Sequence, residues 1–207
     1  MKEGYIDGSK HMGGIWSALS KDELPFQPKR ENHQSDNTDL RSPPMFIVGE
    51  ICTIMDWYRK RKRRIYQLKN GPEQPLVIFD KQMSLQRILL HYDGKKESVK
   101  GIKGFVSIFE EELKQSHITV VSPDFIPKSK IAEEASLVRL LSQKSTETSF
   151  IKFNFNEINE FWNYSLKEEY TLLVTSKKNL VKFIKLSLML CKENTKGVKN
   201  HPSIFLV

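Results

Sequence analysis

The stretch at residues 104–127, GFVSIFEEELKQSHITVVSPDFIP, decides the fold of this 207-residue chain. Its first half carries one apolar face at helical spacing, made by Phe105, Ile108, Phe109 and Leu113. Residues 118–121, Ile-Thr-Val-Val, are typical of a short buried strand that ends at Ser122 and Pro123. A helix that leads into a buried strand is half of a β-α-β layer. The stretch therefore predicts an α/β fold.

The segments around this stretch continue the alternation. Residues 75–80, PLVIFD, form an apolar run typical of a buried central strand, and residues 85–90 follow as either a helix or a second strand. Further along, the patterns predict helices at 131–141, 158–162 and 180–191 and strands at 150–155 and 172–174. This order predicts a three-layer α/β domain with a central, mostly parallel or mixed sheet.

The first 74 residues differ in character from the rest. Residues 1–44 contain a polar run without periodicity, which predicts a flexible or partner-docking arm. Residues 45–68 have apolar side chains at helical spacing and predict a helix, with a hairpin-like entry into a sheet as the alternative. The sequence thus divides into an arm at 1–44, a helical basic extension at 45–74 and an α/β domain at 75–207.

Charge and cysteine content bound the possible partners. A net charge of +8 and a pI near 9.3 favour polyanions: nucleic acid first, then acidic proteins or lipid head groups. A basic protein without such a partner is the alternative. Cys52 and Cys191 lack the spacing of a zinc site or a disulfide framework, which favours a reducing compartment. The most apolar window, 180–191, is too short and too charged to span a bilayer, so we expect no membrane association.

Two basic clusters are candidate nucleic-acid contacts. The first is the uninterrupted run Arg59, Lys60, Arg61, Lys62, Arg63 and Arg64, and the second centres on Lys95 and Lys96. Cations that neutralise several phosphates release counterions and bind in a salt-dependent way. The run is also compatible with a nuclear-import signal or with a solvated helix face.

The sequence contains little that matches known catalytic motifs. Asp80 and Asp124 each follow a predicted core strand and could hold a hard cation, but aspartates at strand ends more often form turns or cap helices. The segment after Asp124 lacks the acidic residue and lysine on a strand that a metal nuclease needs. No phosphate-binding glycine loop or nucleophile elbow is present, and the histidines are scattered. We therefore expect no enzymatic activity, no metal and no cofactor; the alternative is an active metal-dependent nuclease built on Asp80 and Asp124.

The order of motifs resembles the nuclease-fold domain of the XPF/MUS81 family. The residues that carry the resemblance are the strand that ends in Asp80, the helix GFVSIFEEELKQ, the strand HITVVSPD, the strand at 172–174 and the last helix. By this resemblance, Asp80 matches the first-strand aspartate and Asp124 the second, with Pro123 where the family has glycine. The E-R-K signature of the active members has no counterpart here. The resemblance therefore implies a catalytically inactive member in which Asp80 and Asp124 are vestiges of an active site.

Inactive members of this family act as subunits of heterodimers. The resemblance implies an XPF/ERCC1-like protein partner, Spo16-like in the meiotic Zip2/SHOC1 type, and binding to branched or junction DNA. It further implies a nuclear, chromosomal protein of meiotic crossover recombination and synaptonemal complex assembly. Candidate partner contacts are the apolar residues in excess of one helical face: Phe161, Trp162, Leu186, Leu190 and Phe205. The alternative is that these residues close the domain's own core.

Overall fold

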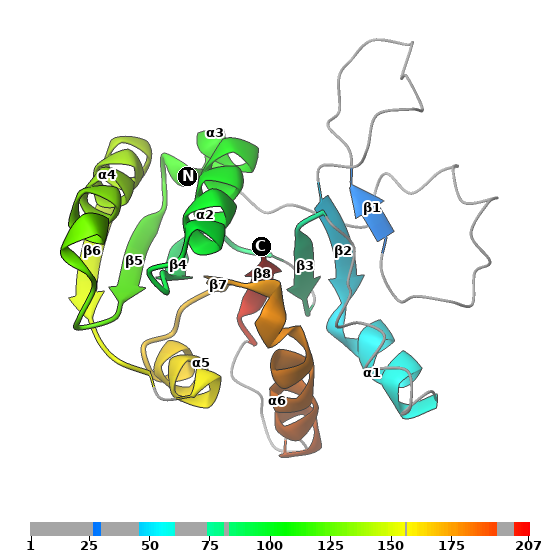
Figure 1. Ribbon diagram of the computed structural model, residues 1–207. Helices are drawn as coiled ribbons and strands as arrows, with labels where there is room; N and C mark the ends of the chain where they lie inside the picture. The colour runs from blue at the N-terminus through cyan, green and yellow to red at the C-terminus, as the bar shows by residue number, and fades with distance from the viewer. Residues whose placement is uncertain (1–26, 30–45, 61–73, 81–82, 156, 194–200) are drawn as a thin grey trace, which may run out of the picture.

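The computed structural model describes the chain except for residues 1–26, 30–45, 61–73, 81–82, 156 and 194–200 (Figure 1). Its strands are β1 (Gln27–Lys29), β2 (Phe46–Glu50), β3 (Leu76–Phe79), β4 (Arg87–His91), β5 (His117–Ser122), β6 (Glu147–Lys152), β7 (Leu172–Thr175) and β8 (Ser203–Leu206). Its helices are α1 (Ile51–Lys60), α2 (Lys96–Ile108), α3 (Glu110–Leu113), α4 (Lys128–Lys144), α5 (Ile158–Lys167), the 3-10 turn η2 (Lys177–Asn179) and α6 (Leu180–Glu193).

The strands form one mixed sheet in the order β1-β2-β3-β8-β7-β4-β5-β6. The five strands from β8 to β6 are mutually parallel, whereas β3 runs antiparallel to β8 and β1 antiparallel to β2. The chain winds outward from β4 in one direction through β5 and β6, and in the other through β7 and β8. The sheet is therefore doubly wound, with its topological switch between β4 and β7.

Helices cover both faces of the sheet, with α2, α3 and α4 on one face and α1, α5 and α6 on the other (Figure 1). Successive strand residues alternate between the two cores, as in β4, where Leu89 packs toward α5 and α6 while Ile88 and Leu90 pack toward α2 and α4. A strand covered on both faces needs apolar residues at every position, which explains the continuous apolar runs. The predicted three-layer α/β architecture with a mixed sheet is confirmed.

The organising stretch has the predicted helix followed by the predicted strand. The helix starts earlier than residue 104, at Lys96, because Val99 and Ile102 extend the same buried face. The helical geometry breaks at Phe109, whose ring contacts that of Phe205 in β8 with centroids 5.6 Å apart. The break separates α2 from the single turn α3, which leads into β5.

Strands β1, β2 and β8 differ from the sequence-based expectation. Residues 27–29, inside the predicted arm at 1–44, form β1, which pairs antiparallel with β2. Residues 46–50 are a strand rather than the start of a helix, because β2 pairs in parallel with β3. With Ile51 and Ile54 of α1 buried in the same core, residues 46–60 belong to the α/β domain and not to an extension of it. Residues 203–206 form β8, an unpredicted strand between β3 and β7. Residues 85–90, left open as helix or strand, fall largely in strand β4.

Within the part of the chain that the structure describes, no helix is long and apolar enough to cross a membrane.

Candidate nucleic-acid interface

Several parallel strands end along one edge of the sheet: β4 at His91, β5 at Ser122, β6 at Lys152 and β7 at Thr175. The helices α2, α4 and α5 and the turn η2 follow these strands and begin at the same edge. Each helix start presents backbone N–H groups and a partial positive charge. This carboxyl edge therefore has an intrinsic preference for anions before any side chain is considered.

Exposed lysines reinforce that preference at the starts of α2 and α4. Lys95 and Lys96 begin α2, Lys128 begins α4, and all three side chains are exposed. The two helix starts are close together, since Lys96 acts electrostatically on Glu133 of α4 and Gly94 lies against Ile126. None of the three lysines forms an ion pair with a described residue. They are free to contact phosphates.

Other lysines at this edge are already paired with carboxylates. Lys178 Nζ lies 2.7 Å from Asp93 Oδ2, and Lys130 Nζ lies 2.9 Å from Glu133 Oε1. Burial would raise the pKa of Asp93, but hydrogen bonds from Lys178, Ser98 and the backbone N–H of Lys95 outweigh it and lower this pKa to about 2. Asp93 is thus an anion near pH 7 and ties η2 to the loop before α2.

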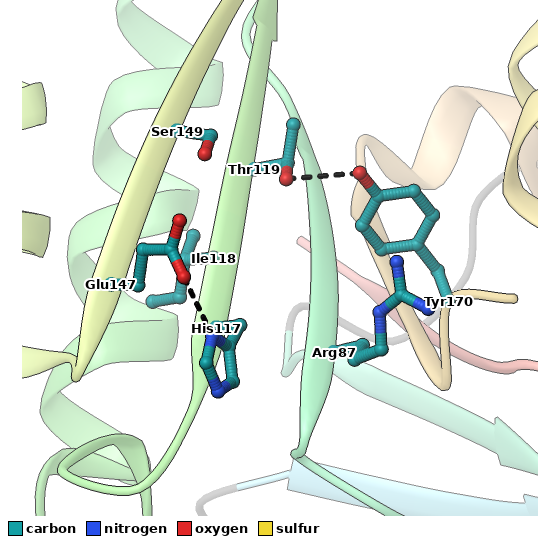
Figure 2. Close-up of a pocket in the computed structure, with 7 residues that line it drawn as sticks. All are labelled: Arg87, His117, Ile118, Thr119, Glu147, Ser149 and Tyr170. Carbon is teal, nitrogen blue, oxygen red and sulfur yellow. Dashed lines mark hydrogen bonds and ion pairs between the residues drawn. The ribbon is translucent and has the colours of Figure 1, made fainter. Parts of the chain in front are cut away.

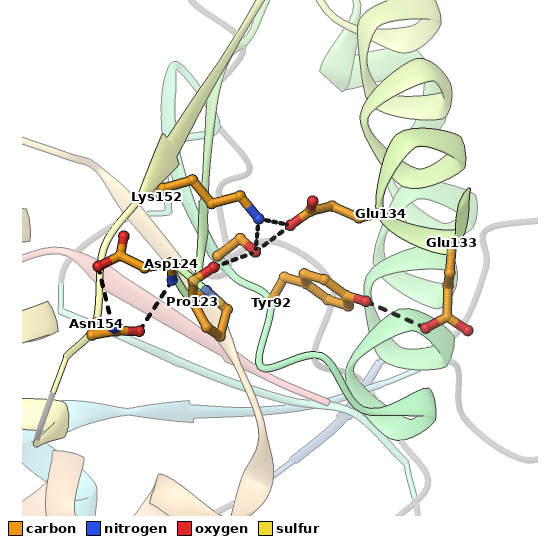
Figure 3. A network of polar contacts seen from close by, with 8 residues as sticks. Tyr92, Pro123, Asp124, Glu133, Glu134, Lys152 and Asn154 are labelled. Carbon is orange, nitrogen blue, oxygen red and sulfur yellow. Dashed lines mark hydrogen bonds and ion pairs between the residues drawn. The ribbon is translucent and has the colours of Figure 1, made fainter. Parts of the chain in front are cut away.

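Figure 3 shows a polar network that fastens α4 to the ends of β5 and β6. Glu134 of α4 accepts hydrogen bonds from Ser122 Oγ and, at 2.6 Å, from Lys152 Nζ. The Nζ of Lys152 also lies 3.2 Å from Ser122 Oγ. A serine beside a lysine can be a nucleophile, but Ser122 is 0% exposed and cannot meet a substrate. The network compensates a buried carboxylate and has a structural role.

Tyr92 adds a second link to α4 by donating a hydrogen bond from its hydroxyl to Glu133 Oε1 at 3.3 Å (Figure 3). Burial, followed by the charge of Glu133, raises the pKa of Tyr92 to about 12. Beyond the strand ends, Asp124 and Asn154 exchange two hydrogen bonds of 3.1 Å each. The first contact joins the end of β4 to α4, and the second joins the segments that follow β5 and β6.

At the switch between β4 and β7, His91 Nδ1 lies 3.2 Å from Thr175 Oγ1, which also accepts a hydrogen bond from Asn179. Burial is the main cause that lowers the pKa of His91, so the ring is neutral near pH 7. The three side chains satisfy one another.

The first basic cluster is described only at Arg59 and Lys60, and these two residues lie on a different helix from Lys95 and Lys96. Arg59 and Lys60 end α1, whose buried residues lie in the core shared with α5 and α6, whereas Lys95 and Lys96 start α2 on the opposite face. Residues 61–64, the rest of the basic run, lie outside the described residues. Lys128 was missed by the sequence reasoning, although the two lysines of Pro127-Lys-Ser-Lys130, at the start of the helix α4 that follows β5, carried the signal.

The structure does not bring Asp80 and Asp124 together. Because β3 runs antiparallel to β8, Asp80 lies at the amino edge of the parallel strands. Burial lowers the pKa of His201 at this edge, and the negative charge of Asp80 acts in the opposite direction. Asp124 follows β5 at the carboxyl edge, with β8, β7 and β4 between the two positions. No cluster of metal-ligating side chains occurs among the described residues. The aspartates therefore do not outline a vestigial two-carboxylate site.

Three of the five predicted partner contacts are core residues. Phe161, Trp162 and Phe205 are 0%, 2% and 0% exposed and pack within the two cores, so their side chains do not reach a partner surface. Leu186 is half-buried against the core of α5 and α6. Leu190 lies in α6 at a position whose side chain falls outside the described residues. The alternative, that these apolar residues close the domain, is the correct one for the three aromatic residues.

Comparisons with known proteins do not identify a family. No family model matches the sequence, and no curated protein matches it. Among solved structures, the chain is similar to one described as "Crystal structure of universal stress protein in complex with cAMP", with 11% sequence identity and a TM-score of 0.38, covering 59% of this chain and 96% of that chain. A likeness of this strength identifies neither a relative nor a ligand.

Proposed function

We propose that this chain is a non-catalytic nucleic-acid-binding subunit that contacts the phosphate backbone with the carboxyl edge of its sheet. The observation that carries the proposal is the position of Lys95, Lys96 and Lys128. They are exposed, lack ion pairs with described residues and lie at two adjacent helix starts. The net charge of +8 gives the whole chain the sign that such a partner requires.

The resemblance to the XPF/MUS81 family supports a more specific form of this proposal. In that form the chain is an inactive XPF-like subunit, pairs with an XPF/ERCC1-like protein and binds branched or junction DNA on chromosomes in the nucleus. Because Asp80 and Asp124 lie at opposite edges of the sheet, this specific form rests on the order of the motifs and on the basic charge, and not on the two aspartates. Since the aromatic candidates are buried, the partner surface has to be made by other residues.

Binding is tested by fluorescence polarisation with Holliday-junction, fork and duplex DNA at two salt concentrations. The test variant is Lys95→Ser/Lys96→Ser/Lys128→Ser. The matched control, Lys167→Ser/Lys182→Ser/Lys185→Ser, removes the same charge from exposed lysines of α5 and α6 on the opposite face.

We expect the test variant to bind DNA more weakly than the wild type. The slope of log affinity against log salt concentration should become smaller in magnitude by about two to three, or about one for each lost phosphate contact. The control should keep most of the affinity. Equal losses in both variants would show that net charge alone drives binding, and no binding to any DNA by the wild type would reject the proposal.

A second candidate function, a protein-protein scaffold with an import signal, rests on the position of Arg59 and Lys60, the two described residues of the basic run. Arg59 and Lys60 lie on a different helix and face from Lys95 and Lys96. This function predicts that replacing the four residues at 61–64 with serine changes localisation in cells and leaves DNA affinity in vitro unchanged.

A further inference from the structure

A polar pocket of about 350 Å³ opens on the sheet at the amino ends of β4, β5 and β6 (Figure 2). Its side chains follow from strand register. Arg87, His117 and Glu147 are direct partners across the three strands, and Thr119 and Ser149 are partners in the next row. Because side chains two residues apart share a face, both rows point to the side of the sheet that carries α5. Tyr170, beyond the end of α5, completes the wall beside Arg87.

Tyr170 is held in a fixed position. Its hydroxyl donates a hydrogen bond of 2.9 Å to Thr119 Oγ1, and its backbone N–H bonds to the carbonyl of Ser165. The preceding residue, Glu169, has a φ of 55°, a conformation that residues other than glycine adopt at a cost. The chain turns sharply after α5 and so presents the Tyr170 ring to the sheet.

Arg87 is placed by Tyr170 and has no anionic partner among the described residues. Its guanidinium carbon lies 5.3 Å from the centre of the Tyr170 ring, a cation-π contact that restricts the side chain. No ion pair joins Arg87 to any residue that the structure describes. A restrained guanidinium with free N–H groups matches the geometry of a phosphate or carboxylate.

The opposite end of the pocket carries hydrogen-bond acceptors, among them a carboxylate, instead of a cation. Glu147 Oε2 lies 3.0 Å from His117 Nδ1, and the exposed hydroxyl of Ser149 faces the same space (Figure 2). Neighbouring strands lie about 4.8 Å apart, so Arg87 and Glu147, two strands apart, have backbones roughly 10 Å from one another. A matching ligand has an anion at one end and hydroxyl or amine donors at the other.

We propose that this pocket binds one 5′-phosphorylated nucleoside unit. The phosphate lies on the Arg87 guanidinium, and the sugar and base edge lie toward His117, Glu147 and Ser149. The pocket volume is at the small end of the range for ligand sites and suits a single nucleotide, not a duplex. The ligand is either a free nucleotide or the 5′ end of a strand, since both present the same group. The pocket lies at the edge of the sheet opposite Lys95, Lys96 and Lys128. This proposal is therefore independent of the proposed nucleic-acid interface at those lysines.

The test is a titration of the full chain with 5′-mononucleotides, in which isothermal calorimetry measures binding. The matching nucleosides, which lack the phosphate, are titrated in the same way for comparison. Arg87→Gln removes the charge, and Arg87→Lys keeps the charge without the planar fork. Arg139→Gln, an exposed arginine of α4 on the opposite face, is the matched control. Thermal unfolding of each variant checks that it is folded.

We expect saturable binding of mononucleotides, a loss of at least about tenfold in Arg87→Gln, a smaller loss in Arg87→Lys and no change in Arg139→Gln. Nucleosides should bind at least about tenfold more weakly than their 5′-phosphates. Absence of mononucleotide binding, or equal binding by wild type and a folded Arg87→Gln, overturns the proposal.

A competition experiment separates the two sources of the ligand. Short single-stranded DNA with a 5′-phosphate displaces the bound mononucleotide if the pocket holds a strand end, whereas the same DNA with a 5′-hydroxyl does so much less. If neither oligonucleotide competes while the mononucleotide binds through Arg87, the ligand is a free nucleotide.

Discussion

Gly101 of α2 lies directly against the side chain of Val207. A Cβ placed on Gly101 would be 2.2 Å from Cγ2 and 2.5 Å from Cβ of Val207, closer than non-bonded carbon atoms approach. Val207 cannot easily retreat, because its N–H bonds to Thr175 and its carbonyl accepts from the N–H of Lys177. The absence of a side chain at residue 101 therefore lets α2 pack closely over the end of β8.

We predict that Gly101→Ala destabilises the protein by about 1–3 kcal/mol, since the overlap with Val207 outweighs the gain of about 1 kcal/mol in helix propensity. Gly104→Ala in the same helix is the matched control, because a Cβ there meets nothing within 4 Å. This control should be about 1 kcal/mol more stable than the wild type. Urea unfolding measures both, and a stabilised Gly101→Ala would contradict the close approach.

Glu169 gives a second backbone prediction. Its φ of 55° falls in the left-handed region that glycine adopts without steric cost. We expect Glu169→Gly to raise the free energy of unfolding by about 1 kcal/mol. Glu168→Gly is the control, since Glu168 has a φ of −91° and gains nothing from glycine. Equal effects of the two substitutions in thermal unfolding would argue against the strained turn.

Asp93 should make stability depend on pH. Its pKa is about 2 in the folded protein and close to 3.8 without these contacts, so the folded state gains stability above about pH 4 and loses it as pH falls toward 2. Because Lys178 is exposed and solvent screens the pair, we expect Asp93→Asn to cost only about 1 kcal/mol at pH 7. The difference between wild type and variant, measured by urea unfolding, should shrink as the pH falls from 4 through 2 and vanish below pH 2. A difference independent of pH would assign the loss to packing instead.

The network around Glu134 yields a prediction about buried charge. Lys152→Met leaves the Glu134 carboxylate, whose side chain is 12% exposed, without its cation, and should cost about 1–3 kcal/mol. Lys152→Met/Glu134→Leu removes both charges and should recover most of that stability. Equilibrium unfolding of the two variants is the measurement. If the double variant is no more stable than the single one, the loss does not come from the unpaired carboxylate.

The sequence predicted most helices and strands because their patterns are local. The face formed by Phe105, Phe109 and Leu113 is visible within a window of ten residues. The short apolar run 76–79, which follows Pro75, is typical of a strand with both faces covered. The helix predicted for residues 46–50 was wrong because apolar spacing in so short a segment suits both a helix and a strand. Pairing with β3 decides between the two.

The candidate sites depended more on contacts that sequence does not contain. Lys95 and Lys96 could be read from the chain as a basic cluster, but their proximity to Lys128 follows from the adjacency of β4 and β5. Arg87, His117 and Glu147 are 30 residues or more apart in the chain, and only register places them in one row. Nothing in their spacing marks them as a group.

The sequence by itself determined the α/β alternation, the two-sided burial of the central strands and the basic charge, because each depends on the identities of neighbouring residues. Tertiary structure alone decided the strand order and the direction of β3. That direction places Asp80 and Asp124 at opposite edges, and the order places Phe205 at the centre of the sheet. The physical reason is that strand pairing joins distant segments through backbone hydrogen bonds, which are the same for every sequence. The choice of partner strand therefore depends on the packing of the whole core.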